Sequence, residues 1–192
     1  METFDAINTR KSIRKYQDKD IPQEILDKIL TAAILSPSGK NKQPWKFYVV
    51  RGEKRAEMVQ EMQKGMDRLG TQGINTGSAR YTIRVMAQAP VTILVFNPFS
   101  RHPLLPRNTQ EIYGDMVDMQ SIGASIQNML LEATDLGIGS LWICDVYFGY
   151  EELSEWVGEK GELIAAVSLG YADHTPRMRL RKPVDEVTVY VE

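Results

Sequence analysis

Apolar residues recur at helical spacing in the first third of the chain. Thr3 is suited to cap a short helix over residues 4–8, and Pro22 is a favourable first residue for a second helix. The charged stretch 53–64 predicts a third helix, whereas the glycines that follow predict an irregular segment over 65–84. The apolar positions of the second helix fall at Ile25, Ile29, Ala32 and Ala33.

The longest apolar pattern predicts a helix over residues 111–136. Small and apolar residues also occupy its opposite face, so we expect it to be buried nearly all round, in part against a partner subunit. Gly137 is placed to end this helix as its C-cap. The repeating apolar positions are Ile112, Met116, Met119, Ile122, Ile126, Met129, Ala133 and Leu136.

Short apolar or β-branched runs predict strands at residues 45–50, 90–96, 140–144, 163–169 and 187–191. A further helix is predicted over 150–157, and the proline-rich stretch 97–108 predicts a surface loop. Helices and strands alternate, and no repeat or linker interrupts them. We therefore expect one domain over residues 1–192, of α+β or α/β class, with helices packed against a central sheet.

The composition is that of an ordinary globular protein, and it argues against several classes of protein. Of the 192 residues, 43% are hydrophobic and 25% charged, and the net charge of −2 argues against nucleic acid as the main partner. No stretch has the length and apolarity of a membrane span, and the first residues do not resemble a secretory signal. Cys144 is the only cysteine, which excludes an internal disulfide and fits a cytoplasmic protein. Its apolar setting predicts a small buried residue rather than a nucleophile.

A basic cluster lies near the start of the chain. In an extended segment Arg10, Ser12 and Arg14 share one side, so two guanidiniums and a hydroxyl converge on one anion, with Lys11 between them. This pattern favours a site for a phosphorylated cofactor. The alternative is a solvated basic cluster beside a helix end, where cations suit the helix dipole.

A second basic cluster lies near the other end, where Arg177, Arg179 and Arg181 alternate in the same way. Two such clusters in a mildly acidic chain are expected to meet around one phosphate. An exposed basic tail is the alternative interpretation.

Two glycine-containing segments suggest further contacts with a ligand. The loop 36–45 is rich in short donors and acceptors and bounded by prolines, so it suits the polar edge of a planar heterocycle, although a solvated connection explains it as well. Its Gly39-Lys40 pair lacks the other residues of a phosphate-binding P-loop. Gly137 and Gly139 follow a helix and lack a third glycine, which excludes a dinucleotide-binding fingerprint but allows the backbone to approach a flat ligand.

The chain is poor in catalytic groups of its own. His102 and His174 are the only histidines, no zinc-ligand spacing occurs, and no nucleophile-elbow motif is present. We therefore predict no catalytic side chain and no metal site. An enzyme with this sequence takes its chemistry from a bound cofactor.

In this order and spacing, the motifs resemble those of the FMN-dependent nitroreductase family over nearly the whole chain. The resemblance implies an α+β fold with a central mixed sheet flanked by helices, in an intertwined homodimer with FMN at the subunit interface. The segments that carry it are Arg10-Lys11-Ser12-Ile13-Arg14-Lys15-Tyr16, Ala33-Ile34-Leu35-Ser36-Pro37-Ser38 with Asn41 and Gln43-Pro44-Trp45, Ala89-Pro90-Val91, Leu136-Gly137-Ile138-Gly139-Ser140, Leu169-Gly170-Tyr171 and Arg181-Lys182-Pro183.

The resemblance also implies which residues bind FMN. Both basic clusters hold the phosphate and ribityl end, Arg14 lies near the N1/O2 edge, the polar loop reaches the flavin from the other subunit, and backbone after the long helix faces the isoalloxazine with an N–H near N5. The implied residues are Arg10, Lys11, Ser12, Arg14, Arg179 and Arg181, then Ser36, Pro37, Ser38 and Asn41, and finally Gly137, Ile138, Gly139, Ser140 and Leu141.

The implied activity is an FMN-dependent oxidoreductase that uses NAD(P)H to reduce nitroaromatics, quinones or similar conjugated acceptors by a ping-pong mechanism. A non-catalytic flavin-binding or sensing protein, and a different flavin reaction such as reductive dehalogenation, are the alternatives. The lid-like helical stretch of longer family members is reduced here to residues 99–108, which leaves the acceptor open. Phe99, His102 and Tyr113 are candidate pocket residues, and no flavin contact is assigned within 65–84.

Overall fold

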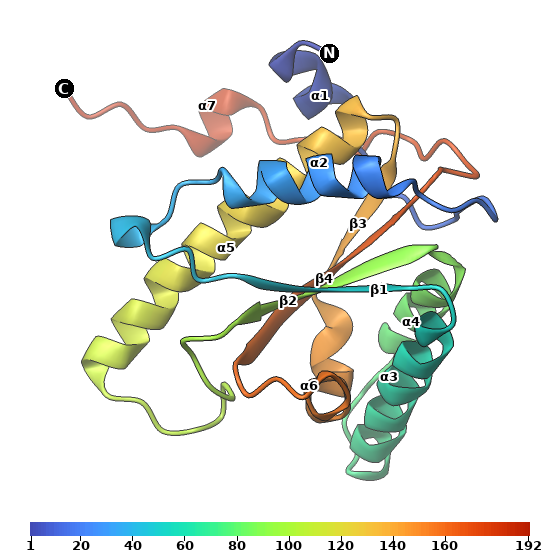
Figure 1. Ribbon diagram of the computed structural model, residues 1–192. Helices are drawn as coiled ribbons and strands as arrows, with labels where there is room; N and C mark the ends of the chain where they lie inside the picture. Colours follow the sequence, from blue (N-terminus) through green and yellow to red (C-terminus); the bar gives the residue numbers. More distant parts are fainter.

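The computed structural model describes residues 1–192 and places a four-stranded sheet between two layers of helices (Figure 1). Every neighbouring pair of strands is antiparallel, so the α+β class is confirmed but the sheet is antiparallel rather than mixed. The one parallel pairing is an isolated bridge between Ser12 and Ser140. In the order β1-β2-β4-β3, the strands are β1 (Lys46–Arg51), β2 (Val91–Asn97), β4 (Glu162–Gly170) and β3 (Gly139–Ile143).

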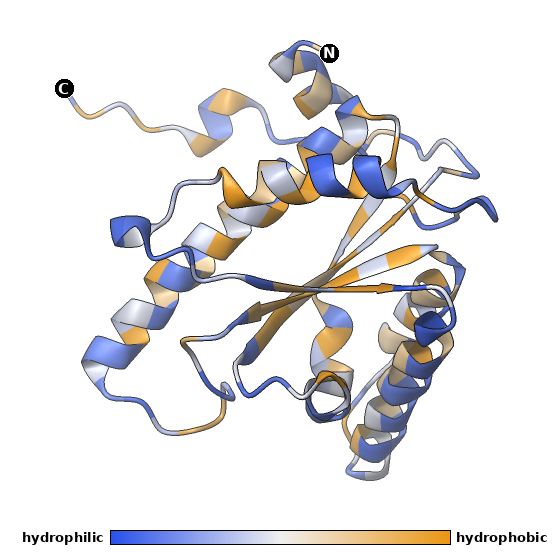
Figure 2. Ribbon diagram, in the orientation of Figure 1, coloured by the Kyte–Doolittle hydropathy of each residue, from blue (hydrophilic) through white to orange (hydrophobic).

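The two central strands, β2 and β4, are buried along their whole length. Because side chains alternate along a strand, β2 supplies Ile93 and Val95 to one layer and Leu94 and Phe96 to the other. Figure 2 shows a largely apolar sheet between helices whose polar residues face outward. One layer contains α2 (Gln23–Ile34) and α5 (Thr109–Asp135), and the other contains α3 (Lys54–Thr71), α4 (Ala79–Gln88) and α6 (Tyr150–Val157).

The ends of the helices follow local signals. α5 begins with a capping box in which Asn108 and Glu111 exchange side-chain-to-backbone hydrogen bonds of 2.9 and 2.8 Å. After α5, Gly137 takes a left-handed φ of 72°, as the C-cap prediction requires. The first helix, α1 (Thr3–Thr9), is capped at Glu2 rather than at the predicted Thr3.

The prediction of an irregular segment over 65–84 holds only for residues 72–78 and is wrong for the rest. α3 continues to Thr71, and α4 begins at Ala79. Gly65 is buried inside α3, where a β carbon would collide with the backbone of Phe148 and Gly149. This glycine is therefore a packing residue that lets α3 approach the short 3-10 helix η2 (Asp145–Gly149), and it does not break the helix.

The predicted strand over 187–191 is also wrong within one protomer. The short helix α7 (Val184–Val187) is followed by an extended tail that ends at Glu192 away from the sheet (Figure 1). Val189, Tyr190 and Val191 are each more than 80% exposed. A strand needs a neighbouring strand for its hydrogen bonds, and the tail has none in its own chain.

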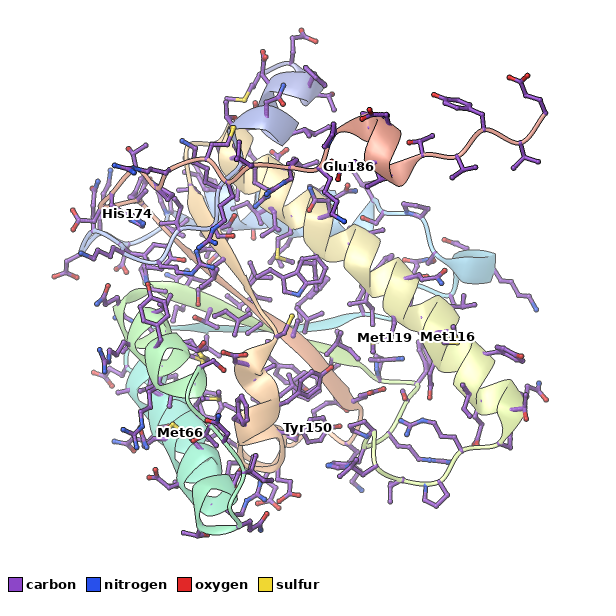
Figure 3. The ribbon with its side chains drawn as sticks, turned by 180° about the vertical axis from the view of Figure 1, so that it is seen from behind. Met66, Met116, Met119, Tyr150, His174 and Glu186 are labelled. Carbon is purple, nitrogen blue, oxygen red and sulfur yellow. The ribbon has the colours of Figure 1, made fainter.

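The long helix is buried on one side only. In its N-terminal half, apolar side chains face outward, and Figure 3 marks Met116 and Met119 among them. The expectation that α5 is buried nearly all round is thus wrong for the protomer. No helix of the structure combines the length and the apolarity needed to cross a bilayer. The outward-facing apolar residues of α5 are Ile112, Tyr113, Met116, Val117 and Met119.

Candidate functional site

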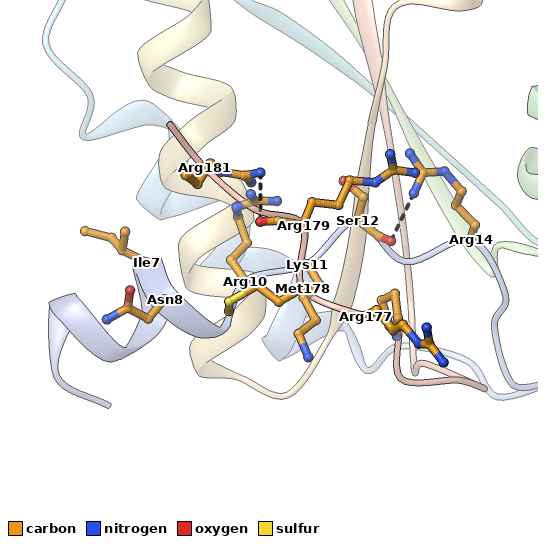
Figure 4. A pocket seen from close by; sticks show the side chains of 11 residues that line it. Ile7, Asn8, Arg10, Lys11, Ser12, Arg14, Arg177, Met178, Arg179 and Arg181 are labelled. Carbon is orange, nitrogen blue, oxygen red and sulfur yellow. Dashed lines mark hydrogen bonds between the residues drawn. The ribbon is translucent and has the colours of Figure 1, made fainter. Parts of the chain in front are cut away.

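The two basic clusters predicted from the sequence meet in one cavity of about 670 Å³. One wall is the segment that follows α1, and the other is the segment that follows β4 (Figure 4). Residues from opposite ends of the chain therefore share one concave surface. The residues that line it are Ile7, Asn8, Arg10, Lys11, Ser12, Arg14, Pro176, Arg177, Met178, Arg179 and Arg181.

The cavity carries a large surplus of positive charge. Its lining includes Arg10, Lys11, Arg14 and the three arginines of residues 177–181, and none of these six side chains pairs with a carboxylate. Their recorded side-chain hydrogen bonds go to backbone carbonyls, from Arg14 to Ser12 and from Arg181 to Arg179. Cations gathered without counter-charges repel each other, so this cavity is complementary to an anion, and guanidiniums match a phosphate in shape.

The first cluster is fixed to the sheet by backbone contacts. Ile13 N donates to Ser140 O at 2.9 Å, which adds the segment beside β3 at the sheet edge. Gly139 makes this approach possible, because a β carbon there would come within about 3 Å of the Ile13 side chain. Further along, the Tyr16 hydroxyl donates to Ile13 O at 2.9 Å. These bonds fix the backbone from which the side chains of Arg10, Ser12 and Arg14 line the cavity.

A second, smaller cavity of about 320 Å³ adjoins the first, and Arg14 lines both. It lies between the start of α4 and the end of β3, and it is mainly apolar, with Tyr81 and Trp142 in its wall. The two cavities thus place a cationic surface beside a mainly apolar one, with Arg14 in both linings. The other lining residues are Ser78, Thr82, Val85, Leu141, Ile143, Cys144 and Asp145.

Sequence reasoning missed this second cavity because it missed α4. The signal was present in the apolar spacing of Ala79, Ile83 and Met86, all buried in the structure. Cys144 is exposed rather than buried, which corrects the expected setting. Partial burial and the nearby Asp145 raise the pKa of the Cys144 thiol, so the neutral form predominates and a nucleophilic role is disfavoured.

The polar loop lies apart from both cavities of its own protomer. It contains Ser36, Pro37, Ser38 and Asn41 around the 3-10 turn η1 (Gly39–Asn41), and none of them lines either cavity. The loop is held on α5, where Gly39 N donates to Ser121 Oγ at 3.2 Å. Within one protomer the loop therefore contributes to neither cavity.

The segment after α5 serves packing more than ligand contact. Gly137 is the C-cap, Gly139 packs on Ile13, and both Ile138 and Ser140 are 2% exposed. Of the residues from Gly137 to Leu141, only Leu141 lines a cavity. The residues of this region that line the second cavity are Leu141, Trp142, Ile143, Cys144 and Asp145, and the flavin contact of residues 137–141 stays a prediction.

The loop 98–108 is built around the Arg107 side chain, which is only 11% exposed. Its guanidinium donates to the carbonyl oxygens of Arg101, His102, Pro103 and Leu105. It also pairs with Asp115 of α5 at 2.5 Å. The candidate pocket residues Phe99, His102 and Tyr113 line neither cavity, and His102 packs edge-on against Tyr150 with ring centroids 4.6 Å apart.

Comparison with known proteins identifies a family and relatives that match most of the chain. The model of the Nitroreductase family matches residues 7–171. Two archaeal proteins, both named "Putative NADH dehydrogenase/NAD(P)H nitroreductase", are 36% identical. The one from Methanothermobacter thermautotrophicus matches over 142 residues, which is 74% of this chain but only 60% of the relative. The one from Archaeoglobus fulgidus matches over 175 residues, 88% of this chain and 85% of the relative.

Two further proteins extend the comparison. An iodotyrosine deiodinase from Hydra vulgaris is 26% identical over 204 residues, covering 96% of this chain and 71% of the relative. A crystal structure from Desulfovibrio desulfuricans, described as a putative nitroreductase in complex with FMN, has a TM-score of 0.76 and 26% identity. That alignment covers 100% of this chain and 98% of the other.

Proposed function

Because the chain belongs to the nitroreductase family, we propose that it is a flavin oxidoreductase that holds FMN in the two adjoining cavities. The observation that carries this proposal is the meeting of two basic clusters without carboxylate partners in one cavity, next to a mainly apolar cavity that shares Arg14 with it. The named complex of a similar structure with FMN supports the same cofactor.

The phosphate of FMN is assigned to the larger cavity. Arg10 and Ser12 approach it from a backbone fixed to the sheet, and Arg179 and Arg181 approach it from the exposed segment, with Lys11 beside them. Charge-assisted hydrogen bonds from guanidiniums to phosphate oxygens are the strong contacts of such a site. The isoalloxazine is assigned to the smaller cavity, against Leu141 and the backbone that follows it.

FMN held in these cavities would supply the redox chemistry between NAD(P)H and a nitroaromatic, a quinone or another conjugated acceptor, and use of one site by both substrates in turn would make the kinetics ping-pong. The protein supplies position and charge. Arg14 stands at the junction of the cavities and favours negative charge at the nearby edge of a bound ring. The exposed Tyr81 and Trp142 offer apolar surface to a ring in the smaller cavity.

The working unit is proposed to be an intertwined homodimer. The outward apolar face of α5 is exposed in the protomer, and an exposed apolar patch of this kind is typical of a protein–protein interface. The apolar C-terminal tail also extends away from its own protomer and packs against nothing there. Dimerisation also brings the loop 36–44 of one protomer to the cavities of the other, where Ser36, Pro37, Ser38 and Asn41 would complete the flavin site.

The first test is the colour and redox behaviour of the purified protein. We expect a yellow protein whose flavin absorbance bleaches under anaerobic conditions when NADH or NADPH is added, and which turns over with a quinone. Protein that stays colourless after titration with FMN would exclude the proposal. Bound FMN that neither nucleotide reduces would instead identify a flavin-binding or sensing protein.

A second candidate reaction is reductive dehalogenation, which the iodotyrosine deiodinase relative favours. The same flavin site would then act on a halogenated phenol. Halide release from iodo- and bromophenols, measured beside quinone and nitroaromatic reduction with the same enzyme preparation, separates the two reactions. A protein that reduces the nitro compound and releases no halide excludes this candidate.

A further inference from the structure

The loop 36–44 adopts a conformation that its sequence does not favour. Lys40, Asn41 and Gln43 have φ values of 53°, 55° and 52°, in the left-handed region where a β carbon meets the backbone. Asparagine tolerates this region better than the other two residues. A short loop with three such residues needs contacts from outside to keep its shape, and strain of this kind gathers at functional sites.

Those contacts come from one turn of α5. Asp118 is 2% exposed, and its carboxylate accepts a hydrogen bond from Lys42 Nζ at 2.5 Å. One turn further along the helix, Ser121 accepts the hydrogen bond from Gly39 N. Residues three apart share a helix face, so Asp118 and Ser121 hold the loop at two points. A β carbon at Gly39 would collide with Val117, so the loop lies directly on the helix.

The same carboxylate also reaches the loop 98–108. Asp118 Oδ2 accepts a second hydrogen bond from Asn97 Nδ2 at 3.2 Å, and Asn97 Oδ1 accepts one from Phe99 N at 3.0 Å. Lys42 Nζ lies 4.8 Å from the centroid of the Phe99 ring, within the range of a cation–π contact. Asp118 and Lys42 thus join the strained loop to the beginning of the loop 98–108.

We propose that Asp118 and Lys42 are positioning residues that hold the loop 36–44 in its flavin-binding shape and link it to Phe99 of the loop 98–108. This inference rests on the proposed function, because the loop acts on the flavin of the partner subunit. A buried carboxylate that loses its cation, or a strained loop that loses its anchor, relaxes to other conformations. The pair therefore affects flavin affinity and acceptor binding together without touching the reacting atoms.

The test compares variants by a flavin-independent and a flavin-dependent measurement. In Lys42→Met and in Asp118→Asn, we expect amide hydrogen exchange within residues 36–44 of the flavin-free protein to accelerate about tenfold or more. We also expect the dissociation constant of FMN to rise about tenfold, a loss of one anchoring charged hydrogen bond. Lys42→Arg keeps the cation and should restore most of both properties.

Steady-state kinetics adds a readout that a general loss of stability would not reproduce. At saturating FMN, the KM for a quinone should rise in Lys42→Met, while the rate of anaerobic flavin reduction by NAD(P)H changes little. The matched control is Lys54→Met, which removes an exposed ion pair to Glu57 on α3 and should leave every value as in the wild type.

The inference would be overturned if Lys42→Met kept three properties within twofold of wild type. These are amide exchange within residues 36–44, FMN affinity and the KM for a quinone. Lys42 is 40% exposed, so this variant folds even where the buried Asp118→Asn does not. Wild-type protein that fails to bind FMN would contradict the proposed function instead, and the exchange measurement would still decide whether the pair fixes the loop.

Discussion

The two basic segments that meet in the larger cavity are similar in sequence and opposite in their attachment. Residues 10–14 bond to β3 through Ile13 N and Ser140 O, and Arg10 and Arg14 are half-buried. Residues 177–181 are exposed, and their only recorded side-chain bond runs from Arg181 to Arg179 O within the segment. One cluster is thus preorganised for an anion, and the other must be ordered when the anion binds.

Because of this difference in attachment, we expect the two segments to contribute differently to phosphate binding. A side chain that is already in place loses little entropy on binding, whereas an exposed arginine offsets part of its gain by the ordering of its side chain and backbone. We therefore expect the first segment to supply most of the binding free energy for phosphate. The second segment supplies attraction at longer range, which salt screens.

The largest effect is expected where the first segment is fixed to the sheet. A β carbon at Gly139 would come within 2.8 to 3.0 Å of Ile13, so Gly139→Val pushes residues 10–14 away from β3. We expect unfolding free energy to fall by about 2–3 kcal/mol and FMN binding to be lost. Chemical denaturation and flavin titration measure both. Gly70→Ala in α3, where a β carbon meets nothing within 4 Å, is the control.

The next effect is the loss of a preorganised charge. Arg10→Ala should weaken FMN binding by about 1–3 kcal/mol, because a charge-assisted hydrogen bond in a shaped cavity is removed. Isothermal titration calorimetry on the flavin-free protein measures the change. Lys182→Ala removes the same charge from the neighbouring tail outside the cavity lining and should leave the affinity unchanged. Equal losses in the two variants would show that Arg10 acts only through net charge.

A smaller effect is expected in the exposed segment. Arg179→Ala should cost about 0.5–1 kcal/mol of FMN affinity at low salt, and the difference from wild type should shrink toward zero at about 1 M salt. Titrations at several salt concentrations measure this trend. A loss as large as that of Arg10→Ala, and independent of salt, would contradict the distinction between the two segments.

The last effect concerns Glu159, outside both segments, and tests stability alone. Burial by itself would raise the pKa of Glu159, but hydrogen bonds from Lys46, Tyr48 and the amides of Gly161 and Lys160 lower it to about 2. Because the pKa is lowered in the fold, the stabilisation is present above the unfolded pKa and is lost as pH falls toward about 2.

Glu159→Gln should therefore reduce stability by about 1 kcal/mol near neutral pH, a modest value because Lys46 is 53% exposed and solvent screens the pair. The difference in melting temperature from wild type should vanish between about pH 5 and about pH 2, with FMN affinity unchanged at neutral pH. A constant difference over that range would show that the carboxylate charge contributes nothing.

The features that the sequence predicted well depend on local physics. The helix over 150–157, the C-cap at Gly137 and the apolar runs of the central strands each carry their own periodic or conformational signal. The convergence of Arg10 and Arg179 in one cavity followed from a family resemblance and from the expectation that two basic clusters meet around one phosphate, and the structure brings these residues together. Their contact with flavin remains a prediction.

The features that the sequence did not predict depend on partners elsewhere in the chain. The sequence predicted that Gly65 breaks a helix, because no residue close to it in the sequence indicates that the backbone of Gly149 packs against it. The sequence also does not indicate that Gly139 packs against the Ile13 side chain. The tail residues 187–191 have strand composition, but a strand exists only beside another strand, which this protomer does not offer.

The mostly buried Arg107 guanidinium affects how easily a protease cleaves the loop 98–108. Long exposed loops are preferred cleavage sites, and a trypsin-like enzyme needs an extended backbone with its arginine side chain free. Here the arginine is 11% exposed and bonded to four carbonyls of its own loop, so the peptide bond after it stays closed to such an enzyme in the native protein. We therefore expect trypsin to cut the bond after Arg107 more slowly than the length of the loop alone would suggest.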